Sequence, residues 1–332
     1  MSSPAFRAFR VFEDGGKVHA RTASLTLDDL SPGDVVIKAA YSGVNYKDAL
    51  AATGAGQIIR RFPLVGGIDV AGTVESSADA RFRSGNEVLV TGYDLGVAHD
   101  GGYAERVRVP ADWIVKTPAG LTAFEAMAIG TAGFTAALSV VDMERNGLTP
   151  SGGPVIVTGA TGGVGSMAVQ ILAALGYQVT ALTGKDAEHE YLRSLGAHAI
   201  LSRSAVEKSS RPLEKSLWAG AVDAVGGETL AWLIKTMKYN GVIASSGLAG
   251  GTELHTTVLP FILRGVKLLG IDSAMCPAEK RRQVWQRLGS DLKPSALPSI
   301  AREISFDELP GAFSTLLEGK ARGRFVVRIS NT

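Results

Sequence analysis

Residues 155–166, VIVTGATGGVGS, join an apolar run typical of a buried strand to a cluster of four glycines and then to a helical pattern. Glycines in such a turn let backbone N–H groups approach phosphate oxygens, and the positive N-terminal end of the next helix stabilises the phosphate charge. We therefore predict that this loop binds a dinucleotide pyrophosphate through Thr161, Gly162, Gly163, Val164 and Gly165. A glycine-rich turn without a ligand is the alternative for the loop taken alone.

The elements around the loop favour the dinucleotide. Apolar residues recur at helical spacing over 164–175, Gly176 follows as a cap, and residues 178–182, QVTAL, have the pattern of a second strand. A strand, a loop, a helix and another strand in this order form a βαβ unit. We therefore predict an α/β protein with a central Rossmann sheet, doubly wound and parallel.

The residues after the second strand favour NADPH over NADH. NAD-binding proteins usually place Asp or Glu about 20 residues after the first glycines, where it binds the ribose 2′-hydroxyl. This chain has Thr183, Gly184 and Lys185 there, and Arg203 follows the next expected strand. A hydroxyl and two cations suit a 2′-phosphate. The alternative is that Lys185 and Arg203 are ordinary solvated charges.

Composition limits the other classes of function. The chain has 332 residues, 45% hydrophobic and 20% charged, and its net charge is +2. This balance gives no drive toward nucleic acid or an anionic membrane. The single cysteine, Cys276, excludes an internal disulfide, and the five histidines form no metal-ligand spacing. We expect a cytoplasmic protein without a signal peptide or membrane span.

The expected secondary structure changes near residue 123. Strand patterns bounded by turns precede this point, and strands then alternate with helices. We predict a β-rich substrate domain formed by residues 1–123 and 300–332, and a dinucleotide-binding domain formed by residues 124–299. Substrate is expected to bind between them.

Several segments together resemble the medium-chain dehydrogenase/reductase superfamily over nearly the whole chain. They are SGVNYKD at 42–48, GGIDVAGTV at 66–74, GTAGFTA at 130–136, the glycine loop and the final GRFVV strand at 323–327. The resemblance implies that the β-rich part is a GroES-like catalytic domain. It also implies a homodimer. The expected strand at 266–271 is a candidate to pair across two Rossmann sheets, since an uncovered edge strand favours such pairing.

The resemblance also indicates a zinc-free branch. Zinc alcohol dehydrogenases place Cys, His and a further Cys or acidic residue around the catalytic metal. The matching positions here hold Asn45, Ile68 and Thr131, a poor ligand set for Zn²⁺. No metal is expected. The zinc-free branch contains quinone reductases and enoyl-thioester reductases.

Further segments are similar to the bacterial acryloyl-CoA reductase subgroup, among them NYKD at 45–48, IIRRFP at 58–63 and PFILRGV at 260–266. The similarity implies NADPH-dependent reduction of acryloyl-CoA, a short enoyl-CoA, to propanoyl-CoA. An NADPH:quinone oxidoreductase is the first alternative, and a non-catalytic NADPH-binding protein is the second.

The resemblance assigns roles to residues beyond the loop. Tyr46 and Asn45 are expected beside the nicotinamide. Tyr46 is expected as a hydrogen-bond or proton donor, although it equally fits a packing or cofactor-binding role, and the Asn45 amide is expected to donate to the substrate enolate or the ribose. Asp48 is expected to cap a helix beginning near Ala49, or to orient a neighbour. Arg324 is expected near cofactor or substrate, with a surface arginine as the alternative. Residues expected along the nicotinamide half of the cleft are Leu248, Ile262 and Ser273, and candidates for the coenzyme A phosphates are Arg60, Arg61 and Arg264.

Overall fold

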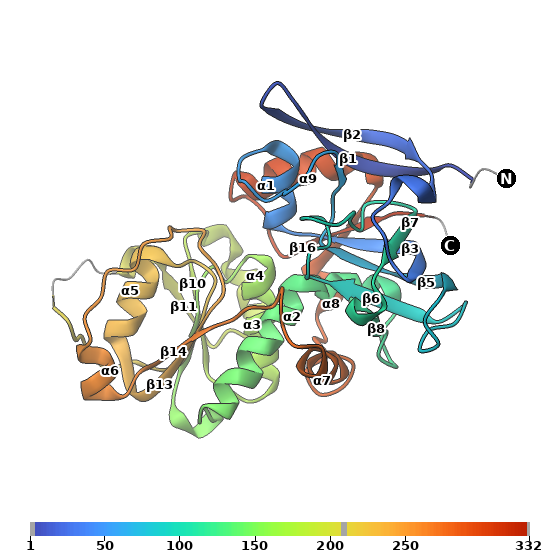
Figure 1. Ribbon diagram of the computed structural model, residues 1–332. Helices are drawn as coiled ribbons and strands as arrows, with labels where there is room; N and C mark the ends of the chain where they lie inside the picture. The colour runs from blue at the N-terminus through green and yellow to red at the C-terminus, as the bar shows by residue number, and fades with distance from the viewer. Residues whose placement is uncertain (1–3, 207–210, 331–332) are drawn as a thin grey trace. The chain divides into compact units, whose positions relative to one another are not determined.

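The computed structural model describes residues 4–206 and 211–330 (Figure 1). The chain forms two compact units. The first contains Met1–Thr131, Ala274–Ser290 and Leu297–Thr332, and the second contains Ala132–Ser273 and Asp291–Ala296. Residues 274–290 were expected in the dinucleotide-binding domain. Here they belong to the first unit, because Arg281 donates hydrogen bonds to the backbone and hydroxyl oxygens of Thr91 and lies over the Tyr93 ring.

Strands dominate the first unit. They are β1 (Phe6–Asp14), β2 (Lys17–Leu25), β3 (Val35–Val44), β4 (Leu64–Val65), β5 (Asp69–Ser77), β6 (Glu87–Thr91), β7 (Arg106–Val109), β8 (Val115–Lys116), β15 (Ala301–Ile304) and β16 (Arg324–Arg328). A three-stranded sheet has the order β2-β1-β4, and a larger sheet has the order β15-β16-β3-β5-β6-β8, with β7 paired to β3. Apart from the parallel pair β15–β16, these strands pair antiparallel.

The first unit also contains helices and a large cluster of buried apolar residues. The helices are α1 (Tyr46–Thr53), α7 (Ala278–Leu288), α8 (Leu297–Ile300), α9 (Leu309–Leu317) and the start of α2 (Ala123–Arg145). Short 3₁₀ turns in the two units cover Leu27–Asp29, Ala111–Trp113, Pro150–Gly152, Asp186–Glu188, Arg203–Ala205 and Phe306–Glu308. Phe9, Tyr103 and Phe313 pack at the centre of the cluster, with ring centroids 5.9–6.4 Å apart.

The second unit is built on one parallel sheet of six strands. They are β9 (Val155–Val157), β10 (Val179–Thr183), β11 (Ala199–Ser202), β12 (Trp218–Asp223), β13 (Met237–Ser245) and β14 (Lys267–Gly270). Their order is β11-β10-β9-β12-β13-β14. Numbered along the chain this is 3-2-1-4-5-6, the Rossmann order, so the predicted fold class is confirmed. The order reverses between β9 and β12, and ligands of such sheets bind at the carboxyl ends of the strands flanking that point.

Helices cover both faces of this sheet, as doubly wound folds require. They are α3 (Gly163–Ala174), α4 (His189–Ser194), α5 (Gly227–Thr236) and α6 (Leu259–Arg264). Figure 1 shows α3 and α4 on one face and α5 and α6 on the other. Strands β9, β10 and β12 are buried along their whole length, which explains their continuous apolar sequences.

Helix α2 contains a break at Gly130. Its backbone there has φ 50° and ψ −159°, a conformation that residues with a side chain rarely adopt, so two helical segments meet at this residue. Among the described residues, α2 is the one helix whose length and mean hydropathy of 1.5 would suit a membrane span. Because 83% of that apolar window is buried inside the protein, α2 has the character of a core helix.

Candidate functional site

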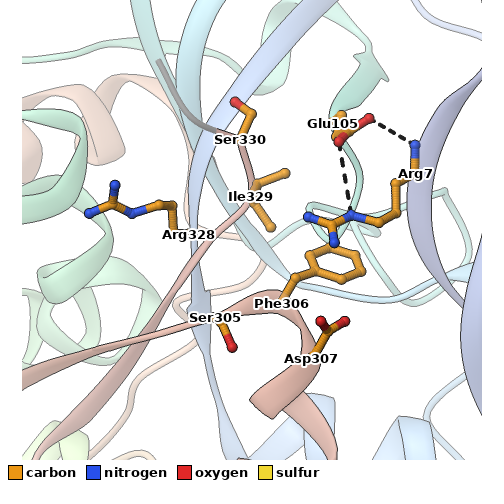
Figure 2. Close-up of a pocket in the computed structure, with 8 residues that line it drawn as sticks. All are labelled: Arg7, Glu105, Ser305, Phe306, Asp307, Arg328, Ile329 and Ser330. Carbon is orange, nitrogen blue, oxygen red and sulfur yellow. Dashed lines mark hydrogen bonds and ion pairs between the residues drawn. The ribbon is translucent and has the colours of Figure 1, made fainter.

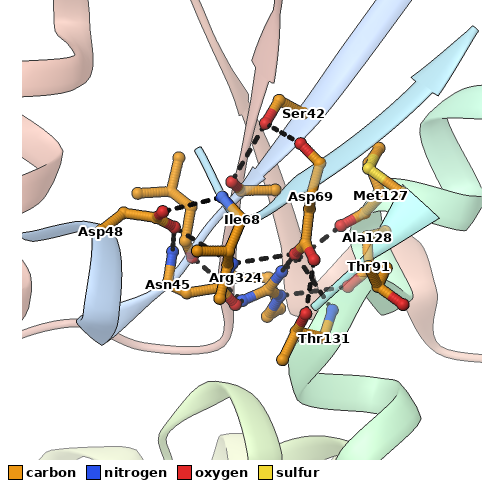
Figure 3. A network of polar contacts seen from close by, with 12 residues as sticks. Ser42, Asn45, Asp48, Ile68, Asp69, Thr91, Met127, Ala128, Thr131 and Arg324 are labelled. Carbon is orange, nitrogen blue, oxygen red and sulfur yellow. Dashed lines mark hydrogen bonds and ion pairs between the residues drawn. The ribbon is translucent and has the colours of Figure 1, made fainter. Parts of the chain in front are cut away.

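A buried carboxylate organises the polar centre of the first unit (Figure 3). Asp69 begins β5 and has no exposed surface. Asn45 Nδ2 donates to Asp69 Oδ2 at 2.8 Å, and Thr131 donates its backbone N–H to Oδ2 at 3.0 Å and its hydroxyl to Oδ1 at 2.5 Å. Arg324 Nη2 lies 3.6 Å from Asp69 Oδ2 and completes a buried ion pair. Four distant segments of the sequence therefore meet at one carboxylate.

Arg324, the first residue of β16, is 3% exposed and directs its hydrogen bonds to the protein. Its Nη1 donates to Val44 O at 2.9 Å and to Asn45 Oδ1 at 2.8 Å, and its Nε donates to Ala128 O at 3.3 Å. Burial lowers the pKa of Arg324, and the Asp69 carboxylate opposes that shift. The alternative of a solvated surface arginine is wrong.

Two glycines make room for the ion pair. A Cβ on Gly43 would lie 2.5 Å from Asp69 Oδ2 and 2.7 Å from Arg324 Nη2. A Cβ on Gly130 would meet the same two atoms, at 2.7 and 2.5 Å. The charged pair therefore lies against two residues that have no side chain, Gly43 and Gly130. A larger residue at either position would displace the pair.

Asp48 was expected to be the cap of a helix beginning near Ala49, and it is instead the N3 residue of the capping box of α1. Its Oδ2 accepts the backbone N–H of Asn45 at 2.8 Å and the Asn45 amide at 3.1 Å, and its Oδ1 accepts the Ile68 N–H at 3.0 Å. Asn45 is the N-cap residue, so the helix begins at Tyr46 rather than near Ala49. The cap also joins α1 to the segment that leads into β5.

The proximity of two carboxylates changes the protonation of this centre. Burial, together with the negative charge of Asp69, raises the pKa of Asp48 to about 7. Burial and the same two carboxylates raise the pKa of Tyr103 well above its usual value, and its hydroxyl donates to Gly43 O at 3.2 Å. The tyrosine is therefore a neutral donor inside the network.

Tyr46 differs from the other three predicted catalytic residues. Its side chain is 44% exposed, whereas Asn45, Asp48 and Arg324 are 8%, 3% and 3% exposed. The structure thus brings three of the four together in one buried network and leaves Tyr46 at its surface, on the first turn of α1. A residue that touches substrate must be accessible, and Tyr46 meets that condition.

The glycine loop of the second unit has the shape of a phosphate cradle. Strand β9 ends at Val157, and Gly162 is the N-cap of α3, so the predicted residues 161–165 form the end of the turn and the first turn of the helix. A Cβ on Gly165 would collide with the Gly159 carbonyl oxygen, because the turn folds tightly against the helix. The geometry fits a pyrophosphate at the helix N-terminus.

The residues predicted to bind a 2′-phosphate lie at the ends of the neighbouring strands β10 and β11. Thr183 ends β10, and its hydroxyl accepts the Lys185 N–H at 3.0 Å. Arg203 follows β11, and its guanidinium lies against Gly184, where a Cβ would be 3.2 Å from Cζ. Two cations therefore flank the turn, and partial burial lowers the pKa of Lys185.

The other predicted cleft residues of the second unit lie in three different places. Leu248 is 58% exposed in the turn after β13, and Ile262 is 69% exposed on α6. Ser273 accepts a hydrogen bond from the Thr135 hydroxyl of α2 at 2.7 Å. The first two are large apolar side chains at the surface, which is typical of a binding face.

Two of the three arginines considered for the coenzyme A phosphates have structural partners. Arg61 pairs with Asp100 at 2.9 Å and donates to a backbone carbonyl, and Arg264 donates to three backbone carbonyls. Arg60 is 70% exposed at its side chain and has a longer contact, 3.4 Å, to Asp94. Arg60 is therefore the candidate that would lose the least interaction energy on turning toward a ligand.

A separate cavity of about 400 Å³ in the first unit contains none of the predicted site residues (Figure 2). Arg7 stacks over the Phe306 ring at 4.4 Å and contacts Glu105 at 3.9 Å. Arg328 pairs with Glu303 at 2.6 Å. The two arginines of the cavity are thus paired with Glu105 and Glu303, and the cavity contributes no residue to the predicted site.

Comparisons with known proteins place the chain in a family. Residues 31–119 match the model of the alcohol dehydrogenase GroES-like domain, and residues 163–290 match that of the zinc-binding dehydrogenases. The chain is 50% identical to the putative quinone oxidoreductase YhfP of Bacillus subtilis over 98% of its own length and 100% of that protein. The chain belongs to the medium-chain dehydrogenase/reductase superfamily.

Other members of the superfamily are equally similar. The probable acrylyl-CoA reductase AcuI of Escherichia coli is 50% identical over 98% of this chain and 100% of its own. The structure of the yhdH oxidoreductase from Salmonella enterica in complex with NADP has a TM-score of 0.95 at 50% identity, covering 98% and 100% of the two chains. The Bacillus subtilis YhfP structure, with NAD bound, has a TM-score of 0.96. The expected GroES-like and Rossmann folds are confirmed.

The zinc of the superfamily does not fit this site. The positions that match its ligands hold an amide, an alkane and a hydroxyl in Asn45, Ile68 and Thr131. Asn45 and Thr131 both hydrogen-bond to Asp69, and the Arg324 cation lies against the same carboxylate. Among residues 4–206 and 211–330, no three side chains of His, Cys, Asp or Glu form a group that would hold a metal. We derive no step through zinc.

Sequence reasoning missed two buried carboxylates. Asp69 was expected only as the first residue of a strand, which it is in β5, and its buried ion pair could not be read from its neighbours in the sequence. Asp223 was also read as a strand residue, and it proves to be fully buried at the carboxyl end of β12. A carboxylate at the end of an apolar strand was the available signal for Asp223, whereas Asp69, at the start of its strand, had no such signal.

Proposed function

We propose that this protein reduces the C=C bond of a short enoyl-CoA with NADPH, converting acryloyl-CoA to propanoyl-CoA. The observation that carries the proposal is 50% identity over nearly the whole chain to a probable acrylyl-CoA reductase. A second relative, the acrylyl-CoA reductase AcuI of Ruegeria pomeroyi, is 49% identical over 96% of this chain. Asn45, Ile68 and Thr131, at the positions expected for zinc ligands, are a poor donor set for Zn²⁺ and so favour a reaction that needs no Lewis acid.

NADPH is the proposed cofactor. The glycine loop and the N-terminus of α3 would hold its pyrophosphate, and Lys185 and Arg203 would hold its 2′-phosphate. The NADP bound to the Salmonella enterica relative supports this choice. Since the Bacillus subtilis relative was crystallised with NAD, NADH belongs in every assay as a competitor. When bound, the cofactor supplies a hydride to the substrate β-carbon.

The substrate then needs a donor near the thioester oxygen and a proton at Cα. Tyr46 is the proposed catalytic residue, because its phenol is accessible and is held at the start of α1. Asn45 was expected to donate to substrate or ribose, but its amide N–H groups are directed to Asp48 and Asp69. We therefore assign Asn45 a positioning role.

Asp48 and Arg324 complete the proposed arrangement as positioning residues. Asp48 fixes the first turn of α1 through its hydrogen bond to the Asn45 N–H, and so holds Tyr46, the first residue of the helix. Arg324 fixes the Asn45 amide oxygen and, through Asp69, the start of the helical segment at Thr131. In this proposal both residues are buried and hold Tyr46 in position, and neither contacts substrate.

Parallel assays of the purified protein test the proposal. NADPH oxidation is measured with acryloyl-CoA, crotonyl-CoA and 1,4-benzoquinone at matched concentrations. The proposal expects turnover with a CoA ester and a higher kcat/KM for it than for the quinone. Turnover with benzoquinone alone would make the protein a quinone reductase, as the name of its Bacillus relative suggests. Tight NADPH binding without turnover of any acceptor would leave the non-catalytic alternative.

We further propose a cytoplasmic homodimer that binds neither nucleic acid nor membrane. Strand β14 is the last in its sheet, so one of its edges lacks a partner strand within the described chain. Large exposed apolar side chains occur in the same unit, at Tyr239, Val258, Ile262 and Leu263. Light scattering after gel filtration should give twice the chain mass, and Leu263→Glu should lower it. A monomeric wild type contradicts the proposal.

A further inference from the structure

Asp223 lies where the strand order of the parallel sheet reverses. It ends β12, which pairs with β9 on one side and β13 on the other. Its side chain has no exposed surface. Sheets of this kind bind nucleotides at the carboxyl ends of the strands on either side of the reversal, so this buried carboxylate stands directly beneath the proposed cofactor site of its own unit.

Four donors surround the carboxylate. Oδ1 accepts the Thr158 hydroxyl at 2.6 Å and the Val225 N–H at 3.2 Å. Oδ2 accepts the Gly226 N–H at 3.0 Å and the Ser245 hydroxyl at 3.3 Å. An ionised carboxylate accepts at both oxygens, whereas an amide of the same shape would turn its NH₂ group toward one pair of donors. The site therefore specifies aspartate rather than asparagine.

The backbone turn held by this carboxylate supports a second turn. Gly250 N donates to Val225 O at 2.7 Å, so residues 246–251 rest on residues 224–227. Gly226 has φ 73° and ψ −159°, and a Cβ there would lie 2.9 Å from Gly247 O. The two turns are in backbone contact, so movement of the first must be transmitted to the second.

We propose that Asp223 is a positioning residue for the dinucleotide: it fixes the 224–227 turn and, through it, the 246–251 turn that presents Leu248. Leu248 is 58% exposed in that second turn. The same carboxylate holds Thr158, the residue directly before the glycine loop, so one buried group connects both sides of the proposed cofactor site. This inference rests on dinucleotide binding in the proposed function.

The burial of Asp223 excludes a direct role in chemistry. Both oxygens are directed to donors from its own unit, and a group that transfers a proton to substrate must reach it. Ser245 and Thr158 hold the carboxylate from the two neighbouring strands. Its effect on a ligand therefore passes through the backbone of the two turns.

The test compares Asp223→Asn with a matched core variant. Ile243→Val removes a methyl group from a fully buried residue of β13 without touching either turn. For each purified protein we would measure the Kd of NADPH by fluorescence titration. Amide hydrogen exchange of residues 224–227 and 246–251 would be measured on the cofactor-free protein. Asp223→Asn should raise the Kd at least tenfold and speed exchange in both turns, whereas Ile243→Val should do neither.

A second pair of variants keeps the test decisive if Asp223→Asn does not fold. Thr158→Val removes the hydroxyl that donates to Asp223 and accepts the Ala224 N–H, while Thr158→Ser keeps it. The valine variant should bind NADPH several-fold more weakly than the serine variant. Unchanged affinity or unchanged exchange at 246–251 in a folded Asp223→Asn protein overturns the inference. A wild type that binds no dinucleotide overturns the proposed function instead, and exchange still decides whether the turns are coupled.

Discussion

Replacing Arg324 by glutamine tests the buried ion pair most directly. The change removes the cation 3.6 Å from Asp69 Oδ2 and leaves that carboxylate in a place with no solvent exposure. Breaking a buried pair by removing one partner typically costs about 3–5 kcal/mol, because the remaining charge is uncompensated. The structure predicts the lower end of that range, since Asn45 and Thr131 still donate hydrogen bonds to Asp69.

Thermal unfolding followed by circular dichroism measures the effect. For a folding unit of this size, a loss of about 3 kcal/mol corresponds to a melting temperature lower by about 6–12 °C. Arg328→Gln is the matched control, because Arg328 belongs to the same strand and pairs with Glu303 at the surface. An exposed pair contributes little, so the control should melt close to the wild type.

The double variant separates the ion pair from the remaining hydrogen bonds. Asp69→Asn alone leaves Arg324 with four acceptors, Val44 O, Asn45 Oδ1, Ala128 O and Met127 O, but without its counter-charge, so both single variants should be destabilised. Asp69→Asn with Arg324→Gln should be less destabilised than the sum of the two, because neither charge is then left without its partner. Strict additivity, or an Arg324→Gln shift no larger than that of Arg328→Gln, would refute the reasoning.

Three further predictions concern single side chains. Because burial and Asp69 raise the pKa of Asp48 to about 7, the folded protein holds a proton that the unfolded chain releases near pH 4. Stability should therefore fall as pH rises from about 4 to about 7, and urea titrations of Asp48→Asn should lack this slope; equal slopes contradict the prediction. Lys185→Gln should lower kcat/KM for NADPH by about tenfold to a hundredfold and leave that for NADH nearly unchanged, since one charged contact to the 2′-phosphate is lost; equal losses with both cofactors would exclude that contact. Tyr46→Phe should lower kcat by about a hundredfold or more at saturating NADPH, and a wild-type kcat would remove its proposed donor role.

The parts of the fold that sequence predicted best are those specified by neighbouring residues. The glycine loop, the start of α3 and the strand after it follow from 30 or so consecutive residues of one βαβ unit. The cap of α1 is equally local, because Asn45 and Asp48 are three positions apart, although that helix was expected to begin three residues later, near Ala49. Such features are set by backbone hydrogen bonds within a few turns of chain, so the sequence displays them directly.

The polar centre depends on partners that the sequence does not connect. Arg324 and Asp69 belong to β16 and β5, each of which pairs with β3, and that sheet order cannot be read from the residues alone. The Asn45 amide was expected to donate to substrate, but in the fold it donates to the carboxylates of Asp48 and Asp69. The fold, rather than the spacing of the sequence, shows that Asn45, Asp48 and Arg324 are buried together while Tyr46 is exposed.

The two glycines beside the ion pair impose an order on how this site can change. While Asp69 and Arg324 are present, a side chain at Gly43 or Gly130 would overlap both of them. After both charged groups are shortened, the space at Gly43 opens, but the backbone of Gly130 still favours glycine because its φ is 50°. The effect of Gly43→Ala thus depends on the residues at 69 and 324, which is epistasis. Anyone rebuilding metal ligands at 45, 68 and 131 would have to remove the guanidinium first.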